Sequence, residues 1–287
     1  ESGNIIEYLG NKLIADGNSN PTDFPRACPD WAEEEAINRA VNMSSATHCP
    51  TYVVHLSTHL GMERIKQAQS LGQRVWTETC PQYLLLSDAE MAKVGPLAKI
   101  GPPLRAEDGP DREAMWRGLE QGHTSIVSSD HSPHPQELKQ VGWDNIFVTP
   151  EGASVPFGSP GLETIVSLTY SEGVVKRGLP IWWLARVMSE NPARIFGLYP
   201  RKGVIQVGSD ADLLIMDPQT DRVITAKDHH SNAGYTLFEG WEVKGTPWMT
   251  LLRGQVLLNQ GNLEQQPGYG EFLPCEGPRS PIGGPVR

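Results

Sequence analysis

The feature that most constrains the fold is an alternation of short apolar runs with amphipathic segments between residues 31 and 130. Three β-branched, apolar runs are of strand length and lie at 51–57, 74–80 and 124–130. Apolar side chains recur at helical spacing in three further segments, at 31–43, 61–72 and 111–122. The last two of these segments end at a glycine, which is a common helix stop. A strand, helix, strand, helix, strand order is typical of a parallel α/β sheet, so we predict an α/β fold.

The texture of the sequence changes after Tyr199. Before this residue, two more helices are predicted at 162–176 and 181–188. After it, short segments rich in Val, Ile and Leu alternate with Gly, Asp and Pro turns. Such spacing favours a small antiparallel β unit, with segments at 203–208, 211–217, 222–225 and 248–259. We predict three regions: 1–198, 199–260 and a Gly/Pro-rich extended tail, 261–287.

Composition excludes several classes of function. The 287 residues carry a formal net charge of -10 with a pI near 5.3, which removes the electrostatic attraction on which nucleic-acid binding depends. Four scattered cysteines lack the spacing of a zinc ribbon or a disulfide scaffold, so we expect reduced thiols and a cytoplasmic protein. No apolar run approaches the roughly 18 residues that span a bilayer. The chain begins at Glu1 and not at Met, which suggests that something is missing upstream.

Groups that ligate metals or move protons follow each predicted strand. His55 ends the first run, Glu78 and Cys80 end the second, and Asp130 ends the third. Active sites of parallel α/β folds lie at the carboxyl ends of the strands, so His55 and Asp130 can converge despite their separation in sequence. Each has an ordinary alternative, because a strand histidine is more often a hydrogen-bonded core residue and an aspartate in SDHSP can cap a turn.

The other histidines are less favoured as residues of such a site. His131 and His134 fit supporting or loop positions, and the pair at 229–230 lies outside the α/β part, where a surface role is favoured. His59 follows His55 by four residues but lies beyond the strand end. A helical face shared by these two is therefore not expected.

Several linked motifs resemble the cyclic amidohydrolases, the group of dihydropyrimidinase, hydantoinase, allantoinase and dihydroorotase. The resemblance runs in order over nearly the whole chain. The motifs are YVVHLS, VWTETCPQYLLL, GPPLR, SSDHSPH, NPARIFGLYPRKGVIQVGSDADLLIMDP and GYTLFEGWEVKGTP.

The resemblance implies a (β/α)₈ TIM barrel metallo-hydrolase with a two-metal zinc centre, flanked by a small β-sandwich. This chain would supply about three barrel strands and part of the sandwich. His55 matches a metal-ligating histidine at the end of the sixth strand, and Asp130 matches the aspartate of the eighth strand, which ligates metal and moves protons. Main-chain groups near Gly101 and Gly158 match the segments that grip the substrate ring.

The implied reaction is hydrolysis of a cyclic amide of the hydantoin or dihydropyrimidine type. A metal-held hydroxide attacks the carbonyl, because a divalent ion lowers the pKa of bound water to about 7. Asp130 takes the proton and returns it to the leaving ring nitrogen. Phe157 stands where dihydropyrimidinases usually carry an asparagine, and Gly101 replaces a serine common in hydantoinases.

The family's remaining metal ligands have no counterpart in these residues. They are an H-x-H pair, a carboxylated lysine and a further histidine, and ESGNIIEYL resembles what directly follows that histidine. We therefore expect an incomplete enzyme that needs an N-terminal segment or chain, is inactive alone, and forms a homo-oligomer when complete.

Three alternatives remain open. SDHSPHP resembles allantoinases and dihydroorotases, so one of those activities is the first. A non-catalytic, dihydropyrimidinase-like scaffold protein is the second, although such proteins lose the metal ligands. The third is an unrelated α/β binding protein in which Asp130 only caps a turn.

Overall fold

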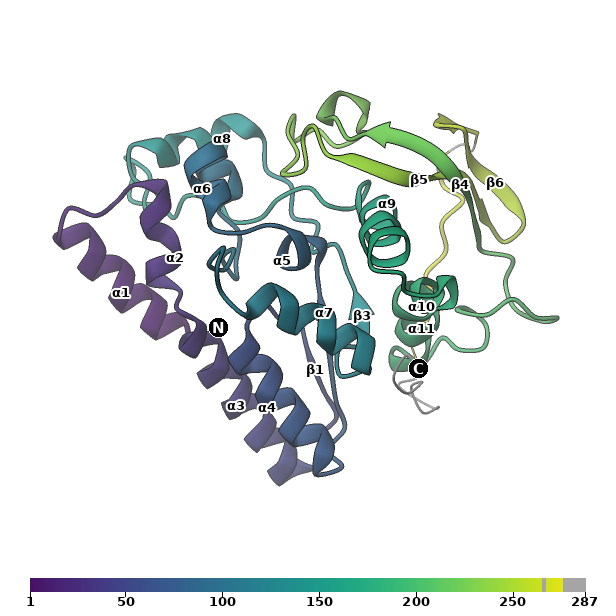
Figure 1. The fold of residues 1–287 in the computed structure, drawn as a ribbon, viewed down its shortest axis with the longest axis horizontal. Helices are drawn as coiled ribbons and strands as arrows, with labels where there is room; N and C mark the ends of the chain where they lie inside the picture. The colour runs from purple at the N-terminus through teal and green to yellow at the C-terminus, as the bar shows by residue number, and fades with distance from the viewer. Residues whose placement is uncertain (265–266, 276–287) are drawn as a thin grey trace. The chain divides into compact units, whose positions relative to one another are not determined.

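The computed structural model describes residues 1–264 and 267–275, which form two compact units (Figure 1). Unit 1 contains residues 1–163 and 225–239, and unit 2 contains residues 164–224 and the described residues from 240 onward. The predicted boundary at 198 falls inside unit 2. Residues 276–287 of the predicted tail lie outside the described residues.

Unit 1 is built around a three-stranded parallel sheet. Its strands are β1 (Thr51–Val53), β2 (Val75–Thr79) and β3 (Ile126–Val127), in that spatial order. Thr51 pairs with Val75, and Thr79 pairs with Val127, both in parallel register. The predicted parallel α/β arrangement is confirmed, although each strand is shorter than its apolar run.

Three long helices connect and cover these strands, as the periodicity predicts. They are α3 (Asp30–Thr47), α4 (His59–Ser70) and α7 (Asp111–Gln121). Helix α4 packs against α3, α7 and β2 and buries Met62 and Ile65 completely. The apolar stripe of α4 therefore forms the middle of the unit 1 core.

The remaining helices of unit 1 were not predicted. Most are shorter than two turns, which is too short for a helical period to emerge from the sequence. The α-helices are α1 (Gly3–Ala15), α2 (Phe24–Ala27), α5 (Pro81–Leu85), α6 (Ala89–Val94) and α8 (Gln136–Gln140). The 3₁₀ turns are η1 (Pro21–Asp23), η2 (Gly95–Ala98), η3 (Val141–Trp143) and η6 (Ala226–Asp228).

Unit 2 combines a helical segment with an antiparallel sheet. The helices are α9 (Ile165–Thr169), the π-helical η4 (Tyr170–Lys176), α10 (Ile181–Ala185), the π-helical η5 (Arg186–Glu190) and α11 (Asn191–Ile195). The strands are β4 (Leu213–Val223), β5 (Glu242–Leu252), β6 (Gln255–Asn259) and β7 (Asn262–Leu263), each antiparallel to the next. The predicted antiparallel β unit is confirmed.

The strand predicted at 203–208 is wrong. The segment forms turns, with Gly203 and Gly208 at φ values of 80° and 93°. Two of its apolar side chains, Ile205 and Val207, are exposed, and Ile205 is 87% exposed in unit 2. Alternating apolar residues between two glycines of left-handed conformation therefore mark a loop here and not a strand.

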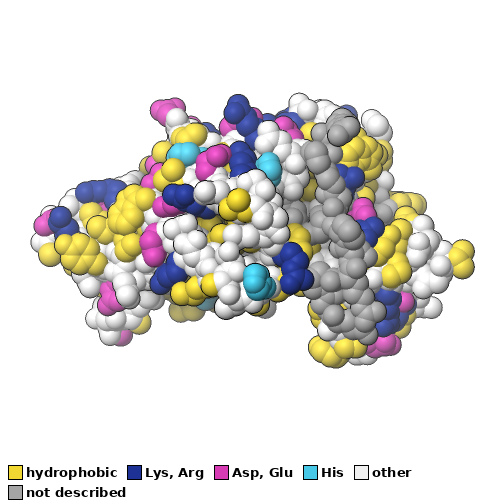
Figure 2. All heavy atoms as spheres, turned by 90° about the horizontal axis from the view of Figure 1, so that it is seen from below, with side chains coloured by type: hydrophobic (Ala, Val, Ile, Leu, Met, Phe, Trp, Pro, Cys, Tyr) yellow, Lys and Arg dark blue, Asp and Glu magenta, His cyan; other side chains and the backbone are white. Residues whose placement is uncertain are grey.

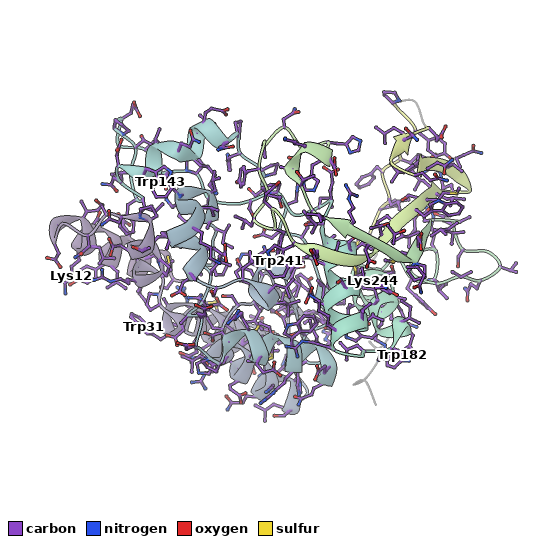
Figure 3. All side chains as sticks on the ribbon, turned by 45° about the horizontal axis from the view of Figure 1, so that its top comes forward. Lys12, Trp31, Trp143, Trp182, Trp241 and Lys244 are labelled. Carbon is purple, nitrogen blue, oxygen red and sulfur yellow. The ribbon has the colours of Figure 1, made fainter. Side chains whose placement is uncertain are left out.

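Charged side chains of both signs lie on the surface. On the face in Figure 2, basic and acidic side chains are interspersed. No helix among the described residues is long and apolar enough to cross a membrane. All four cysteines carry free thiols, as expected. Trp182, labelled in Figure 3, lies on the surface of α10 with the Arg186 guanidinium 4.6 Å from its ring centre.

Candidate active site

The carboxyl ends of the three parallel strands carry the predicted site residues. The Leu56 amide donates to the Glu78 carbonyl at 2.8 Å, and the Ser128 amide donates to the Thr79 carbonyl at 2.9 Å. His55 and Asp130 therefore leave the sheet from the same edge as Glu78, on either side of the central strand β2. Parallel α/β folds place their ligand sites at this edge.

Both His55 and Asp130 have left-handed backbone conformations. Their φ values are 39° and 45°, in a region that non-glycine residues rarely occupy. This conformation turns the chain sharply away from each strand as it ends. Strained backbone of this kind concentrates at active sites and ligand clamps, so the two observations support a functional role.

Asp130 is half-buried, and three causes act on its pKa. Burial raises the pKa of this carboxyl above its usual value, the charge of His55 lowers it, and the charge of Glu78 raises it. Charges interact in this way only over short distances. His55 and Asp130, on strands separated by β2, therefore belong to one electrostatic environment.

Glu78 and Cys80 have partners of their own. The Tyr52 hydroxyl donates to the Glu78 carboxylate at 2.5 Å, and burial raises the pKa of that hydroxyl. The Cys80 sulfur lies 3.5 Å from the Ser128 hydroxyl, and burial keeps the pKa of the thiol well above its usual range. Cys80 is thus a completely buried thiol of the unit 1 core.

The segments around Gly101 and Gly158 meet beside this edge. The Gly158 amide donates to the Lys99 carbonyl at 3.0 Å, two residues before Gly101. The Ser132 amide donates to the Ser159 carbonyl at 3.1 Å, which fixes residues 157–159 against the loop that follows Asp130. The structure thus assembles both predicted substrate segments next to Asp130.

Glycine is required at position 158. Its φ is 104°, and an added Cβ would lie 2.5 Å from the main-chain oxygen of Ser132. An added Cβ at Gly101 would lie 3.3 Å from the Phe157 ring, a tight approach. The two glycines therefore let three segments come closer than side chains would permit.

A buried polar network, which sequence reasoning missed, supports the same region. The Glu33 carboxylate accepts hydrogen bonds from the amides of Ser57 and Thr58, at 2.9 and 3.1 Å. It also pairs with Arg105 of the GPPLR motif at 2.8 Å, and the Glu33 and Arg105 side chains are 3% and 7% exposed. The network joins α3 to the turn after His55 and to the segment after Gly101.

A signal for this network exists in the sequence. Glu33 precedes Ile37 and Val41 by four and eight residues, so it shares their buried helical stripe. A carboxylate on an apolar stripe predicts a buried partner.

The other histidines act locally. His59 begins α4, and its Nδ1 lies 2.8 Å from the Asp111 carboxylate of α7. His131 accepts the amides of Gly161 and Leu162 at Nδ1, at 3.1 and 3.2 Å, which fits the predicted supporting role. His230 lies on the surface with its Nδ1 2.9 Å from the Glu163 carboxylate.

The donor set at the strand ends fits part of a metal centre. His55 offers an imidazole nitrogen and Asp130 a carboxylate oxygen, which are donors that zinc and similar ions accept. Among the described residues, no group of three or more His, Cys, Asp and Glu side chains is arranged to hold a metal ion. These two side chains therefore fit as ligands but do not make a complete site.

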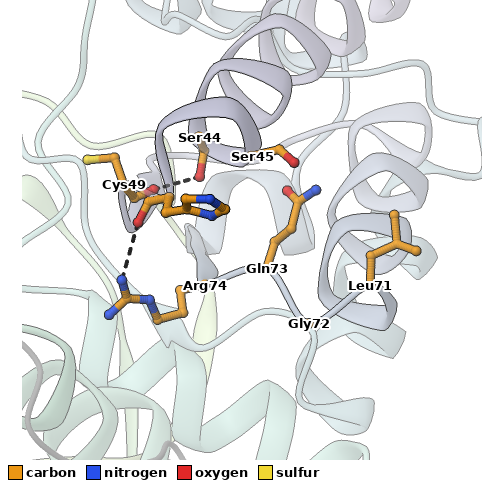
Figure 4. A pocket seen from close by; sticks show the side chains of 8 residues that line it. Ser44, Ser45, Cys49, Leu71, Gly72, Gln73 and Arg74 are labelled. Atoms are coloured by element: carbon orange, nitrogen blue, oxygen red, sulfur yellow. Dashed lines mark hydrogen bonds between the residues drawn. The ribbon is translucent and has the colours of Figure 1, made fainter.

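A cavity of about 430 Å³ lies elsewhere in unit 1 (Figure 4). Ser44, His48, Cys49 and Arg74 are among its lining residues, and Arg74 donates to the His48 carbonyl at 3.2 Å. Its lining includes residues that directly precede β1 and β2. It therefore lies at the amino ends of the strands, opposite to the edge that carries Asp130.

Comparison with known proteins identifies the class that this fold and strand-end site define. The amidohydrolase family profile matches residues 85–257, which is more than half of the chain. The chain belongs to the amidohydrolase family, and the predicted family membership and fold class, part of a (β/α)₈ barrel with part of a small β domain, are confirmed.

Similar relatives are named hydantoinases. The chain is 37% identical to an L-hydantoinase of Paenarthrobacter aurescens and 35% identical to a D-hydantoinase of Geobacillus stearothermophilus. Each match covers 95% of this chain but only 58% and 57% of the relatives. A dihydropyrimidinase from Brevibacillus agri matches in structure with a TM-score of 0.92 and 32% identity, over 97% of this chain and 60% of that one. The chain thus spans less than two thirds of these relatives.

Proposed function

We propose that the complete enzyme containing this chain hydrolyses the amide bond of a cyclic amide of the hydantoin or dihydropyrimidine type. One observation carries the proposal: His55 and Asp130 leave the carboxyl ends of β1 and β3 on either side of β2, at the strand edge beside which the Gly101 and Gly158 segments meet. The names of the relatives, hydantoinase and dihydropyrimidinase, give the substrate class.

Asp130 is the proposed proton carrier. In hydrolysis, water adds its oxygen to the ring carbonyl carbon, the C–N bond breaks, and the ring nitrogen gains a proton. A carboxylate beside the reacting water accepts a proton during attack and delivers it to the leaving nitrogen.

His55 and Asp130 are the proposed ligands that this chain gives to a divalent metal, which we take to be zinc. Bound there, the ion would supply a Lewis acid that activates water and polarises the amide carbonyl. The family's other ligands would come from residues outside this chain. The position of both residues at the carboxyl ends of their strands, on either side of β2, supports this assignment.

Main-chain groups near Gly101 and Gly158 are proposed to bind the ring amide. A cyclic amide presents one N–H and one C=O, and main-chain carbonyls and amides complement both. Phe157 lies beside Gly101 and adds an apolar surface. This pairing replaces the serine and asparagine expected from the family with a glycine and an aromatic ring.

The test is ring opening by the complete protein loaded with zinc. Hydantoin, dihydrouracil, allantoin and dihydroorotate are each supplied, and the ring-opened acid is measured. We expect turnover of hydantoin or dihydrouracil, with kcat lowered about 10²- to 10⁴-fold by Asp130→Asn, the usual contribution of a general acid-base group. Asp108→Asn, at an exposed turn of the same unit, is the matched control and should leave kcat unchanged.

Other outcomes would replace the proposal. Turnover of allantoin or dihydroorotate alone would assign one of those activities. A folded protein without stoichiometric metal and without turnover would indicate the non-catalytic scaffold. Equal activities of the Asp130→Asn and wild-type proteins would refute the role of Asp130.

A further inference from the structure

A buried lysine ties together the two segments that are proposed to bind substrate. Lys139 lies on α8 and its side chain is fully buried, at 0% exposure. Its Nζ donates to the main-chain carbonyls of Leu97, Lys99 and Gly158, at 3.0, 2.9 and 2.5 Å. Two of these carbonyls belong to the segment before Gly101 and the third to Gly158 itself.

Three acceptors suit the ammonium form of Lys139. An ammonium group has three N–H donors, whereas a neutral amine has two. Burial, together with the nearby charge of Lys99, lowers the pKa of Lys139 to about 7. All three acceptors are carbonyls, so the charge is held without a carboxylate in this set of bonds. Such burial is costly, which argues that the contacts serve something besides stability.

Further contacts hold the segment before Gly101 against residues 155–158. The Lys99 carbonyl accepts both the Lys139 ammonium and the Gly158 amide, the latter at 3.0 Å. The Tyr235 hydroxyl also donates to the Gly158 carbonyl at 3.3 Å. The Lys99 ammonium donates to the Val155 carbonyl at 2.8 Å and lies 4.2 Å from the Phe157 ring centre. The main-chain amide and carbonyl of Gly158 therefore both form hydrogen bonds within the protein.

We propose that Lys139 is a positioning residue that sets the distance between the Gly101 and Gly158 segments and so determines how tightly the cyclic amide is held. The inference rests on the proposed function, because those segments are the proposed substrate contacts. Lys139 does not touch the substrate. Its ammonium acts through the carbonyls of Leu97, Lys99 and Gly158.

The first experiment measures the positions directly, without turnover. Lys139→Met in the complete protein keeps the length and apolar stem of the side chain and removes the three donors. We expect the peptides covering 97–104 and 155–162 to exchange amide hydrogen about tenfold faster, the change that loss of one hydrogen bond of about 1.4 kcal/mol produces. The β2 peptide, 75–79, should keep its wild-type rate.

The second experiment separates positioning from folding by kinetics. We expect Lys139→Met to raise KM for the ring substrate about tenfold, with kcat within about threefold of wild type, because binding contacts are displaced. A purely structural loss would instead lower apparent kcat in proportion to the folded fraction at unchanged KM. Lys93→Met, an exposed lysine on the neighbouring α6, is the matched control and should change neither constant.

A second variant covers the case in which Lys139→Met does not fold. Lys139→Gln keeps an N–H donor and should give exchange rates and KM between those of wild type and full loss. Unchanged exchange in both segments together with unchanged KM would overturn the proposal, as would faster exchange that includes the β2 peptide. Absence of ring opening by the wild type refutes the proposed function alone, since hydrogen exchange still decides the role of Lys139.

Discussion

Single buried charges distinguish unit 1 from an ordinary α/β core. Lys99 and Lys139 are almost completely buried among main-chain carbonyls, and Glu33 and Arg105 are buried as a pair. All four lie in or next to the segments that follow the strand ends. Because isolated buried charges are costly, each of them should have a measurable effect when it is removed.

The pH dependence of stability should report the buried lysines. Burial lowers the pKa of Lys99 to about 7, below the value of 10.5 for an exposed lysine. Between these values the unfolded chain binds more protons than the folded one, so stability rises with pH from 7 upward. Each such lysine contributes up to about 1.4 kcal/mol per pH unit. Lys99→Met should therefore flatten the rise in the urea midpoint between pH 7 and 9.

The comparison needs an upper pH limit and a control. Burial raises the pKa of the Cys28 thiol to about 12, so above pH 9 the unfolded chain loses that proton first and the slope is opposed. Lys93 is exposed, and its pKa is raised by Glu90, so Lys93→Met should keep the wild-type slope below pH 9. Parallel midpoint curves for Lys99→Met and wild type would show that Lys99 carries no such linkage.

Removing one charge of the buried pair should be strongly destabilising. Glu33→Gln leaves the Arg105 guanidinium buried without its carboxylate, and we expect the free energy of unfolding to fall by about 3 to 5 kcal/mol. Glu63→Gln removes an exposed helical ion pair with Lys66 and should cost less than about 1 kcal/mol. Urea unfolding of both variants measures the difference. Equal losses would show that the Glu33 network contributes no more than a surface pair.

At the scale of helices and strands, the sequence predicts what is long and periodic. Helices α3, α4 and α7 follow from apolar spacing over 11 to 18 residues, although α1, of 13 residues, was not predicted. The parallel strands are short and follow from their β-branched runs. Helices α5, α6 and α8 are too short for a period to appear, and the segment at 203–208 has strand composition but turn geometry. The strand-end positions of His55 and Asp130 follow from the α/β rule. The Lys139 contacts depend on segments 40 residues apart, which no local pattern encodes.

The packing of η4 on β5 in unit 2 depends on a glycine. Gly245 has a φ of 81°, and an added Cβ would lie 2.3 Å from the Tyr170 ring. The Lys244 amide donates to the Ser171 hydroxyl at 3.1 Å, so a hydrogen bond joins helix and strand next to this contact. Gly245→Ala should destabilise unit 2 by about 1 to 3 kcal/mol through overpacking, in addition to backbone strain.

A second glycine separates the two causes. Gly254 has a φ of 79°, but an added Cβ would meet only Ala211, at 3.9 Å. Gly254→Ala therefore introduces the backbone strain without the clash. Thermal unfolding should show a larger loss for Gly245→Ala, and equal losses would mean that Tyr170 moves aside without cost.

At the scale of the whole molecule, the chain carries the proposed proton carrier and the proposed substrate segments but few candidate metal ligands. It spans 58% of the length of the L-hydantoinase that it matches, and among its described residues no group of three or more His, Cys, Asp and Glu side chains is arranged to hold a metal ion. Tight zinc sites use three or four protein ligands. Affinity for metal should therefore depend on residues that this chain does not contain.

Metal analysis of the isolated 287-residue chain tests whether zinc binding depends on residues outside it. After incubation with zinc and desalting, we expect well under one zinc per chain and no ring-opening activity, because two ligands bind a divalent ion too weakly to survive dilution. The complete protein, treated in the same way, should keep its zinc and lose much of it in His55→Ala. His59→Ala is the matched control, because His59 pairs with Asp111 away from the strand edge. If the isolated chain retained one zinc and released it in His55→Ala, the described residues would form a metal site by themselves, and the dependence on further ligands would be wrong.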